Sequence, residues 1–468
     1  MSEIKFGTDG WRAIIAREYT ETNVMRVAEG TAKWILSKNI ANPKAVIGYD
    51  CRFGGEMFMK ATACVFAHFG ITSIVAETFI STPMVSLATL RLNAAAGIVI
   101  TASHNPPTYN GFKIKDSFGG PAVPKEIAKV EANIPTVSNL NLKSFESYRT
   151  EGLIQFEELE EMYLEAIKNG IDFNLINESG YELAYDAMYG AGQRAMRNLL
   201  PDTTFLHCEF NPWFDGQAPE PIDKNLQELA SLIEIAEDID LGIATDGDAD
   251  RIGLYNSKGK FIDSHHIILL LIQYLHKYKG LSGKVVNSFS CTGKISNLCK
   301  HYGLDQEITK IGFKYICDTI IIEDVLIGGE ESGGIAIKGH IPERDGLWIG
   351  LTILEFMAFT GKSLDALIEE VYAITGPFAV ERYDLHIDEA TKQRVILNCT
   401  NKAFSSLGQF QIQKEEDLDG FKYHLGNDRW VMIRPSGTEP VLRVYAEAET
   451  SEKAFEILEE TKKVILGE

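Results

Sequence analysis

Positively charged residues are scarce in this chain. It has 45 Lys and Arg residues against 66 Asp and Glu residues, which gives a formal net charge of -21 at pH 7. Proteins that follow a nucleic-acid backbone need a cationic footprint, and anionic lipid surfaces repel acidic proteins. We therefore expect neither nucleic acids nor membranes among its partners.

The chain also lacks paired cysteines, long apolar runs and a secretory signal. Its seven cysteines are scattered without a C-x-x-C spacing, which is typical of reduced thiols and gives no support for a zinc site. The apolar stretch 262–275 is broken by Asp263, His265 and His266 and is too short for a transmembrane helix. The N-terminus has no apolar segment between a basic start and a cleavage site. These features predict a cytoplasmic protein.

Strands and helices alternate along most of the 468 residues. Apolar residues recur at helical spacing in 22–37 and 55–69, whereas 45–48 and 95–100 are short apolar runs typical of buried strands. Such alternation indicates βαβ units, which bind ligands at the carboxyl ends of their strands. Residues 135–149 resemble a polar linker.

After this linker the pattern restarts twice and then changes near Pro377. Second and third rounds of strand, small-residue turn and helix begin at 182–185 and 284–289. The last segment is predicted to contain strands at 378–387, 423–433 and 441–446 and helices at 389–405 and 451–466. The sequence therefore predicts three similar α/β domains with mixed or parallel sheets, followed by a C-terminal α+β domain.

The first polar motif, TASHNPP at 101–107, follows a predicted buried strand. A serine held at such a strand end by a proline-stiffened loop suits a nucleophile or a phosphate carrier, although a simple polar turn has the same features. A Ser103–His104 hydrolase dyad is disfavoured, because neighbours on an extended chain point in opposite directions and no G-x-S-x-G motif surrounds the serine. Lys113 could supply a cation or a proton.

The second motif, DGDADR at 246–251, lies between two predicted strands. Carboxylates at positions i, i+2 and i+4 of an extended loop share one face and can converge on a hard divalent cation. A calcium-binding EF-hand is excluded, because Arg251 stands where the turn glycine belongs and Ser257 where the last glutamate belongs. A solvated acidic turn is the remaining alternative.

Three further motifs are rich in glycine. GGEESGG at 328–334 places Glu330 and Ser332 two residues apart, so that both can face one ligand. RPSGTEP at 434–440 combines a guanidinium, hydroxyls and exposed backbone N–H groups into a cradle suited to phosphate, without being a nucleotide P-loop. FGTDGWR at 6–12 opens the chain with a glycine-bracketed loop that ends in Arg12.

In this order, the five segments resemble the α-D-phosphohexomutase superfamily, in its phosphoglucomutase/phosphomannomutase branch. The resemblance runs from Phe6 to Pro440. It implies a heart-shaped molecule of four domains around a central cleft, with one motif from each domain lining that cleft. The expected boundaries are 1–143 for the phosphoserine domain, 144–254 for the metal-binding domain, 255–373 for the sugar-recognition domain and 374–468 for the phosphate-binding domain.

The resemblance also implies a role for each motif. Ser103 is expected to carry a phosphoryl group and to contribute to a Mg²⁺ site. The other metal ligands are expected to be the carboxylates of Asp246, Asp248 and Asp250. Glu330 and Ser332 are expected to bind the sugar. The phosphate that is not reacting is expected to be held by Arg434, Ser436, Gly437 and Thr438.

The implied reaction interconverts hexose 1-phosphate and hexose 6-phosphate, of glucose or mannose, through a phosphoserine and a hexose 1,6-bisphosphate. Phosphoryl transfer depends mainly on positioning and charge neutralisation. Arg12 and Arg251 are expected to neutralise the transferring group, while Lys113 with His104 moves protons. The enzyme is expected to act on small sugar phosphates as a monomer or homodimer.

The chain departs from some superfamily members at the sugar loop. Those members carry His after the GExSG core, whereas this chain has Gly334, so any acid/base role of that residue is expected to pass to His340 or Lys314, which are also expected to bind the substrate. Glucosamine-specific relatives tend to carry Gln after the first Glu and Asn after the Arg of the phosphate loop. Glu331 and Pro435 stand at these places here, which favours glucose or mannose phosphates.

Three alternatives stay open. A phosphoglucosamine mutase would use the same motifs on an amino sugar. A metal-dependent phosphatase would use the same serine and acidic loop but release free phosphate. A non-catalytic sugar-phosphate-binding protein would need neither Ser103 nor Lys113.

Overall fold

The structure is a computed structural model that describes residues 4–7, 9–435 and 441–467. The chain divides into two compact units. The first contains residues up to 284 together with 312–367, and the second contains 285–311 together with the residues from 368 onwards. Helix α14 (Leu364–Thr375) spans the point of division.

The first unit begins with a mixed sheet in the strand order β1-β5-β4-β2-β3-β6. Its strands are β1 (Trp11–Ile14), β5 (Tyr109–Asp116), β4 (Ala96–Ile100), β2 (Lys44–Tyr49), β3 (Thr72–Val75) and β6 (Ile154–Phe156). β2 pairs in parallel with β3 and β4, whereas β5 runs antiparallel to β4 and β1. The carboxyl ends of β2 and β4 therefore meet at one edge.

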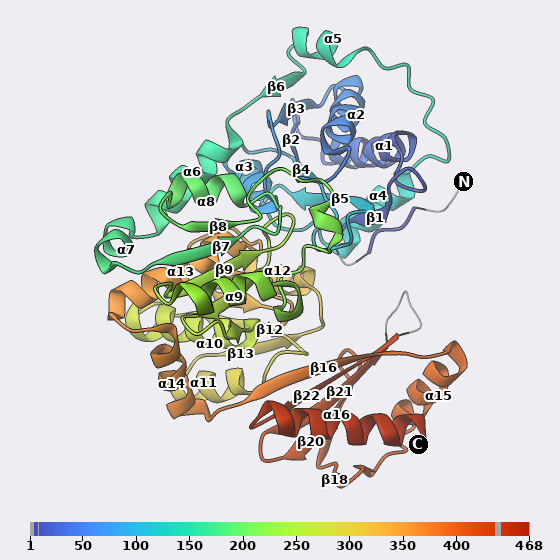
Figure 1. The fold of residues 1–468 in the computed structure, drawn as a ribbon. Helices are drawn as coiled ribbons and strands as arrows, with labels where there is room; N and C mark the ends of the chain where they lie inside the picture. Colours follow the sequence, from blue (N-terminus) through green and yellow to red (C-terminus); the bar gives the residue numbers. More distant parts are fainter. Residues whose placement is uncertain (1–3, 8, 436–440, 468) are drawn as a thin grey trace. The chain divides into compact units, whose positions relative to one another are not determined.

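Helices flank this sheet on both sides, and Figure 1 shows α2 and α3 on opposite sides of it. The helices are α1 (Glu21–Ser37), α2 (Gly55–His68), α3 (Thr82–Arg91), α4 (Pro124–Asn133) and α5 (Phe145–Thr150). Thr20 and Ser81 cap α1 and α3 with side-chain oxygens, as residue types preferred at this position do. Helices 22–37 and 55–69 are thus confirmed to within one residue at each end.

A second mixed sheet follows, in the order β11-β10-β9-β7-β8. Its strands are β7 (Leu183–Asp186), β8 (Thr204–Leu206), β9 (Leu241–Thr245), β10 (Ile252–Asn256) and β11 (Phe261–Ile262). The accompanying helices are α6 (Leu159–Gly170), α7 (Phe173–Ser179), α8 (Gln193–Leu199) and α9 (Gln227–Ala236). β9 and β10 pair antiparallel, so the acidic loop closes a hairpin.

The rest of the first unit contains the antiparallel pair β14 (Val325–Gly329) and β15 (Ile335–Ile337). Around it lie α10 (Ser264–Gln273), α12 (Phe313–Ile320) and α13 (Gly346–Thr360), and α10 continues into a π-helical turn, Tyr274–Tyr278. The GGEESGG segment connects β14 and β15. Like the serine loop between β4 and β5 and the acidic loop between β9 and β10, it therefore closes an antiparallel pair.

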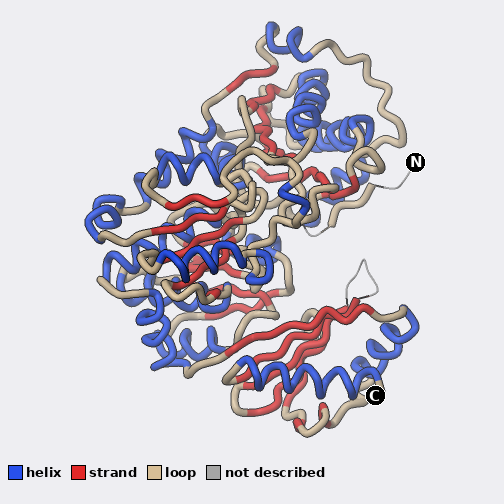
Figure 2. The backbone as a smooth tube through the Cα atoms, viewed as in Figure 1, coloured by secondary structure: helices blue, strands red, loops and turns tan. Residues whose placement is uncertain are grey.

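The second unit combines a parallel pair with an antiparallel sheet. β12 (Lys284–Ser288) pairs with β13 (Gln306–Thr309), and α11 (Lys294–Tyr302) connects them. The sheet has the order β16-β22-β21-β20-β19, with β16 (Ala379–His386), β22 (Val441–Ala448), β21 (Arg429–Pro435), β20 (Phe421–Gly426) and β19 (Lys414–Glu416). α15 (Glu389–Thr400) and the short pair β17 (Ser406–Leu407) and β18 (Phe410–Gln411) complete it, and α16 (Ser451–Leu466) lies along one face (Figure 2).

The alternating α/β pattern and the C-terminal α+β segment are confirmed, but four details differ. The helix predicted at 389–405 ends at Thr400. The predicted linker 135–149 contains all of α5 except its last residue, Thr150, and α7 was not predicted. The predicted strand 423–433 is two strands, because Asn427 and Asp428 both adopt positive φ, 54° and 59°, and form a tight hairpin turn.

Within the described residues, no single helix is long and apolar enough to cross a membrane. One bent pair of helices, α13 with α14, passes that test by length and composition.

Candidate active site

Ser103 lies just beyond the carboxyl end of β4, fully buried and in a strained backbone conformation. Its φ is 52°, which costs a residue other than glycine about 1–3 kcal/mol. Its Oγ donates a hydrogen bond to Asp246 Oδ2 at 2.7 Å and lies 3.3 Å from His104 Nδ1. The strained turn therefore presents the serine hydroxyl to the acidic loop.

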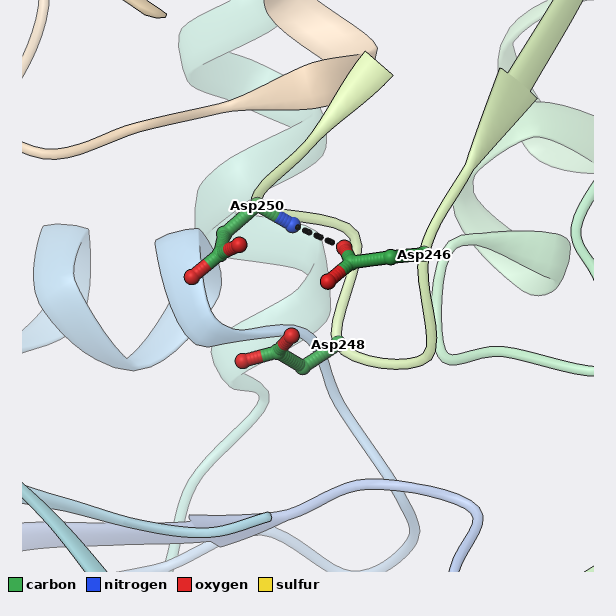
Figure 3. A group of neighbouring side chains, drawn as sticks. All are labelled: Asp246, Asp248 and Asp250. Carbon is green, nitrogen blue, oxygen red and sulfur yellow. Dashed lines mark hydrogen bonds between the residues drawn. The ribbon is translucent and has the colours of Figure 1, made fainter. Parts of the chain in front are cut away.

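The acidic loop is organised by its own first carboxylate. Asp246 Oδ1 accepts from the backbone N–H groups of Asp250 at 3.0 Å and Arg251 at 3.1 Å. Figure 3 shows the side chains of Asp246, Asp248 and Asp250 projecting to the same side of the loop. One carboxylate oxygen from each lies within 4.8 Å of the others, and all three residues are buried. The predicted convergence of i, i+2 and i+4 carboxylates is thus observed.

This group of carboxylates has the chemistry of a divalent-cation site. Among the residues that the structure describes, the buried oxygens Asp248 Oδ1 and Asp250 Oδ1 have no hydrogen-bond partner. Buried acceptors are nearly always satisfied, so such atoms need an explanation. Burial, together with the charges of Asp248 and Asp250, raises the pKa of Asp246 well above its ordinary value. A hard cation would satisfy the oxygens and balance the charge.

Lys113, on β5, reaches the same carboxylates from the first sheet. Its Nζ lies 2.7 Å from Asp248 Oδ2, 2.9 Å from Asp250 Oδ2 and 3.0 Å from Asp9 Oδ2. Burial by itself lowers the pKa of Lys113, but the charges of these carboxylates outweigh it and raise the pKa above its ordinary value. The side chain is therefore held as an ammonium ion.

The other predicted catalytic residues surround Ser103. Burial, followed by the cationic charges of Arg251 and Arg12, holds the pKa of His104 well below its ordinary value, so its imidazole is neutral. Arg12 Nη1 donates to Asn105 Oδ1 at 2.7 Å. Arg251 Nε lies 4.0 Å from Asp250 Oδ1. Serine, imidazole and two guanidinium groups thus lie around one acidic loop.

The sugar loop lies against the acidic loop. Ile252 N donates to Gly333 O at 3.2 Å, and Arg251 and Gly334 form an isolated β-bridge. Glu330 is buried, and this burial raises its pKa to about 7. Ser332 is half-buried. The structure therefore brings the serine, acidic and sugar motifs together within the first unit.

Three further residues contact the acidic loop or the cations that pair with it. Arg344 Nη2 lies 2.8 Å from Asp250 Oδ2 and contacts Asp9, and Thr82 donates to Asp248 Oδ2. Asp9 belongs to the glycine-bracketed loop near the N-terminus, and no spacing in that loop indicated that its carboxylate would reach this site. Thr82 is the first residue of α3 and lies in none of the five sequence motifs. The carboxylates of the acidic loop are thus contacted by side chains from four separate segments, namely Ser103, Lys113, Thr82 and Arg344.

Lys314 lies near Asp9 of this site, whereas His340 pairs with Asp345. Lys314 lines a cavity of about 200 Å³ together with Asp9 and Glu131. His340 Nε2 lies 2.8 Å from Asp345 Oδ2, and its ring stacks on Trp348 with 3.7 Å between ring centroids. Their expected substrate-binding roles stay predictions.

The phosphate loop belongs to the second unit. Arg434, at the end of β21, lies 3.3 Å from Asp419 Oδ2 through its Nη2 and is partly exposed. Ser436, Gly437 and Thr438 lie outside the described residues. The expected role of Arg434 in binding a phosphate stays a prediction.

Comparisons with known proteins agree with this arrangement. Four phosphoglucomutase/phosphomannomutase models match in order: α/β/α domain I at residues 3–141, domain II at 161–259, domain III at 263–374 and the C-terminal domain at 396–464. A solved structure of a putative phosphomannomutase from Thermus thermophilus is 32% identical, with a TM-score of 0.87 over 99% of each chain. The chain belongs to the phosphoglucomutase/phosphomannomutase family.

Further similar proteins are named for several substrates. The phosphoglucomutase/phosphomannomutase of Thermococcus kodakarensis is 29% identical over 97% of this chain and 96% of its own length. A phosphoglucosamine/phosphogalactosamine mutase of Sulfurisphaera tokodaii is 27% identical over 99% of each. A solved Aspergillus fumigatus N-acetylphosphoglucosamine mutase, in complex with GlcNAc-6P and magnesium, shares the fold at 16% identity and a TM-score of 0.55, covering 99% of this chain and 96% of its own. The chain is a phosphohexomutase, an isomerase with the four-domain α/β architecture of its family.

Proposed function

We propose that this mutase interconverts the 1- and 6-phosphates of glucose or mannose through a phosphoserine at Ser103 and a hexose 1,6-bisphosphate. The observation that carries the proposal is the contact of Ser103 Oγ with Asp246 Oδ2 at 2.7 Å, inside a group of three buried carboxylates. The four expected segments, 1–143, 144–254, 255–373 and 374–468, would supply phosphoserine, metal, sugar and phosphate binding.

Asp246, Asp248 and Asp250, with an oxygen at Ser103, would hold Mg²⁺. When bound, the ion would neutralise charge on the phosphoryl group as it transfers. The orphaned oxygens of Asp248 and Asp250 support this choice, since hard dications prefer carboxylate oxygens.

The transfer conserves atoms and charge. The P–O bond to Ser103 Oγ breaks while a P–O bond forms to the free hydroxyl of the sugar monophosphate, and the proton of that hydroxyl ends on Ser103 Oγ. His104 Nδ1, 3.3 Å from this oxygen, is placed to take and return the proton. The ammonium of Lys113 and the guanidinium groups of Arg12 and Arg251 balance the charge of the phosphoryl group.

The bisphosphate then turns over and returns its other phosphoryl group to Ser103. Both orientations need the same recognition groups. Glu330 and Ser332 would bind adjacent sugar hydroxyls, with Lys314 and His340 as further candidates. The phosphate that is not reacting would lie on Arg434, Ser436, Gly437 and Thr438.

An amino-sugar phosphate is the second candidate substrate, because several similar proteins are named phosphoglucosamine mutases. The deciding experiment measures kcat/KM for glucose 1-phosphate, mannose 1-phosphate and glucosamine 1-phosphate in parallel, with hexose 1,6-bisphosphate and Mg²⁺ present. We expect higher values for glucose or mannose. Release of free phosphate without isomer formation would contradict the mutase reaction and indicate a phosphatase.

A further inference from the structure

Two buried residues after β2, Asp50 and Arg52, make an unusual set of contacts with the serine loop. Arg52 Nη2 donates to the backbone carbonyls of Ser103 and Asn105, both at 2.6 Å. Arg52 Nη1 donates to the carbonyls of Pro106 at 2.8 Å and Tyr109 at 2.9 Å. One guanidinium therefore holds four carbonyls of the loop that carries Ser103.

Asp50 holds the other side of the same serine. Thr101 Oγ1 donates to Asp50 Oδ2 at 2.5 Å and accepts from Ser103 N at 2.8 Å. Asp50 is itself paired with Arg52, with 3.3 Å between Oδ2 and Nε, and accepts from Arg52 N at 2.9 Å. The carbonyl of Ser103 thus accepts from Arg52, and its N–H is linked through Thr101 to Asp50, the other member of the same ion pair.

The ion pair is isolated from solvent. Asp50 and Thr101 are 0% exposed and Arg52 is 2% exposed. Charge-assisted hydrogen bonds in such surroundings are roughly twice as strong as neutral ones. A strand such as β2 can end without an ion pair. Burying two charges is costly unless their hydrogen bonds are well satisfied. Its contacts are instead directed at the loop whose central residue has a φ of 52°.

We propose that Asp50, Arg52 and Thr101 are positioning residues that fix the strained backbone of Ser103 and so aim its Oγ at the acidic loop. We call these three residues the serine brace. Phosphoryl transfer requires attacking and leaving oxygens in line, and a small misplacement of a reacting group can cost a factor of about a hundred in rate. The proposal rests on the proposed function of Ser103 as the phosphoryl carrier.

The test uses Thr101→Val, which keeps the shape of the side chain and removes the hydroxyl between Asp50 and Ser103. Thr62→Val is the matched control, because Thr62 is equally buried in the same domain and its hydroxyl donates to Phe58 O within α2. Thr101→Ser restores a hydroxyl at the brace. Each full-length variant is compared with the unaltered protein by amide hydrogen exchange of the segment 101–109 and by kcat and KM.

For Thr101→Val we expect exchange in 101–109 to accelerate about tenfold and kcat to fall about tenfold, with KM changed less than about twofold. Thr62→Val and Thr101→Ser should match the unaltered protein in both measurements. Unchanged exchange in Thr101→Val, or an equal loss in Thr62→Val, would overturn the proposal.

Arg52→Lys is the second probe, since an ammonium cannot reproduce the planar fork that reaches four carbonyls. It should slow turnover more than Thr101→Val does; if it fails to fold, the threonine series decides alone. Intact mass after incubation with hexose 1,6-bisphosphate separates the two proposals. An unaltered protein that gains no phosphoryl group contradicts the carrier role, whereas the exchange measurement still tests the brace.

Discussion

The Cα of Gly334 lies directly against the side chain of Arg344, so that a Cβ atom there would be 2.4 Å from Arg344 Cδ. Arg344 is buried, and its Nη2 lies 2.8 Å from Asp250 Oδ2. No side chain fits at this position while Arg344 keeps its place, so the glycine and the buried arginine depend on each other.

Gly334→Ala should therefore disturb the acidic loop through Arg344. Overpacking of a filled interior typically costs about 1–3 kcal/mol, and displacing the guanidinium from Asp250 should also lower kcat. Thermal unfolding and steady-state kinetics check both effects. Gly293→Ala is the control, because a Cβ at Gly293 would meet nothing nearer than 3.9 Å. Equal effects in the two variants would contradict the pairing of Gly334 with Arg344.

Local patterns in the sequence predicted much of the fold and the core of the site. The helical spacing of apolar residues predicted α1 and α2 to within one residue at each end, and α16 was predicted to end at Leu466 as observed. The spacing of Asp246, Asp248 and Asp250 predicted their convergence, but the predicted extended loop is a tight turn, in which Ala249 has a φ of 57° and its N–H donates to Asp246 O.

Contacts between distant segments could not be predicted in this way. Asp9 and Arg344 are 335 residues apart, and no periodicity links them. The brace on Ser103 was missed for the same reason, since Arg52 lies 51 residues before it and recognises backbone carbonyls, which carry no sequence signal. The turn at Asn427 and Asp428 does carry a local signal, because Gly426, Asn427 and Asp428 are residue types common in tight turns, and the predicted strand 423–433 ran through it.

Ser103→Ala tests the carrier role. Without the hydroxyl no phosphoserine forms, so turnover should fall by about a thousandfold or more, while the groups that bind sugar phosphate stay in place. Intact mass with hexose 1,6-bisphosphate and calorimetric binding of the monophosphate measure the two effects. A near-normal rate would exclude Ser103 as the carrier.

Asp248→Asn tests the metal site. An amide keeps one oxygen but loses the charge that a hard cation requires, so the Mg²⁺ concentration for half-maximal rate should rise about tenfold or more. Removal of metal with a chelator should abolish turnover of the unaltered protein, and Mg²⁺ should restore it. Asp384→Asn is the control, because Asp384 is an exposed residue of the second unit, and it should leave the metal titration unaltered. An unchanged titration in Asp248→Asn would count against the site.

Arg434→Ala tests whether one phosphate cradle serves both isomers. The distal phosphate of the 1-phosphate and of the 6-phosphate would contact the same guanidinium, so KM for both should rise about tenfold or more, as expected for loss of a charge-assisted hydrogen bond. Arg382→Ala, an exposed arginine of the same unit, serves as the control. A rise for one isomer alone would contradict binding in two orientations.

His207 should make the stability of the protein depend on pH. Its hydrogen bond to Asp186, with the charges of Asp186, Glu228 and Glu209, raises its pKa from 6.5 to about 9 despite partial burial. A histidine whose folded pKa is raised stabilises the folded state fully below its unfolded pKa, and this contribution disappears as pH rises through the folded pKa. The stabilisation should therefore fade between about pH 6.5 and about pH 9.

The measurement compares the thermal midpoints of the unaltered protein and His207→Gln across this range. The unaltered protein should be the more stable at about pH 6, and the difference should shrink towards about pH 9.5, where the imidazole is neutral. His301→Gln, at an exposed site on α11, should show no such trend. A difference that stays constant or grows with pH would mean that His207 is neutral in the folded protein, and the ion pair with Asp186 would then be absent.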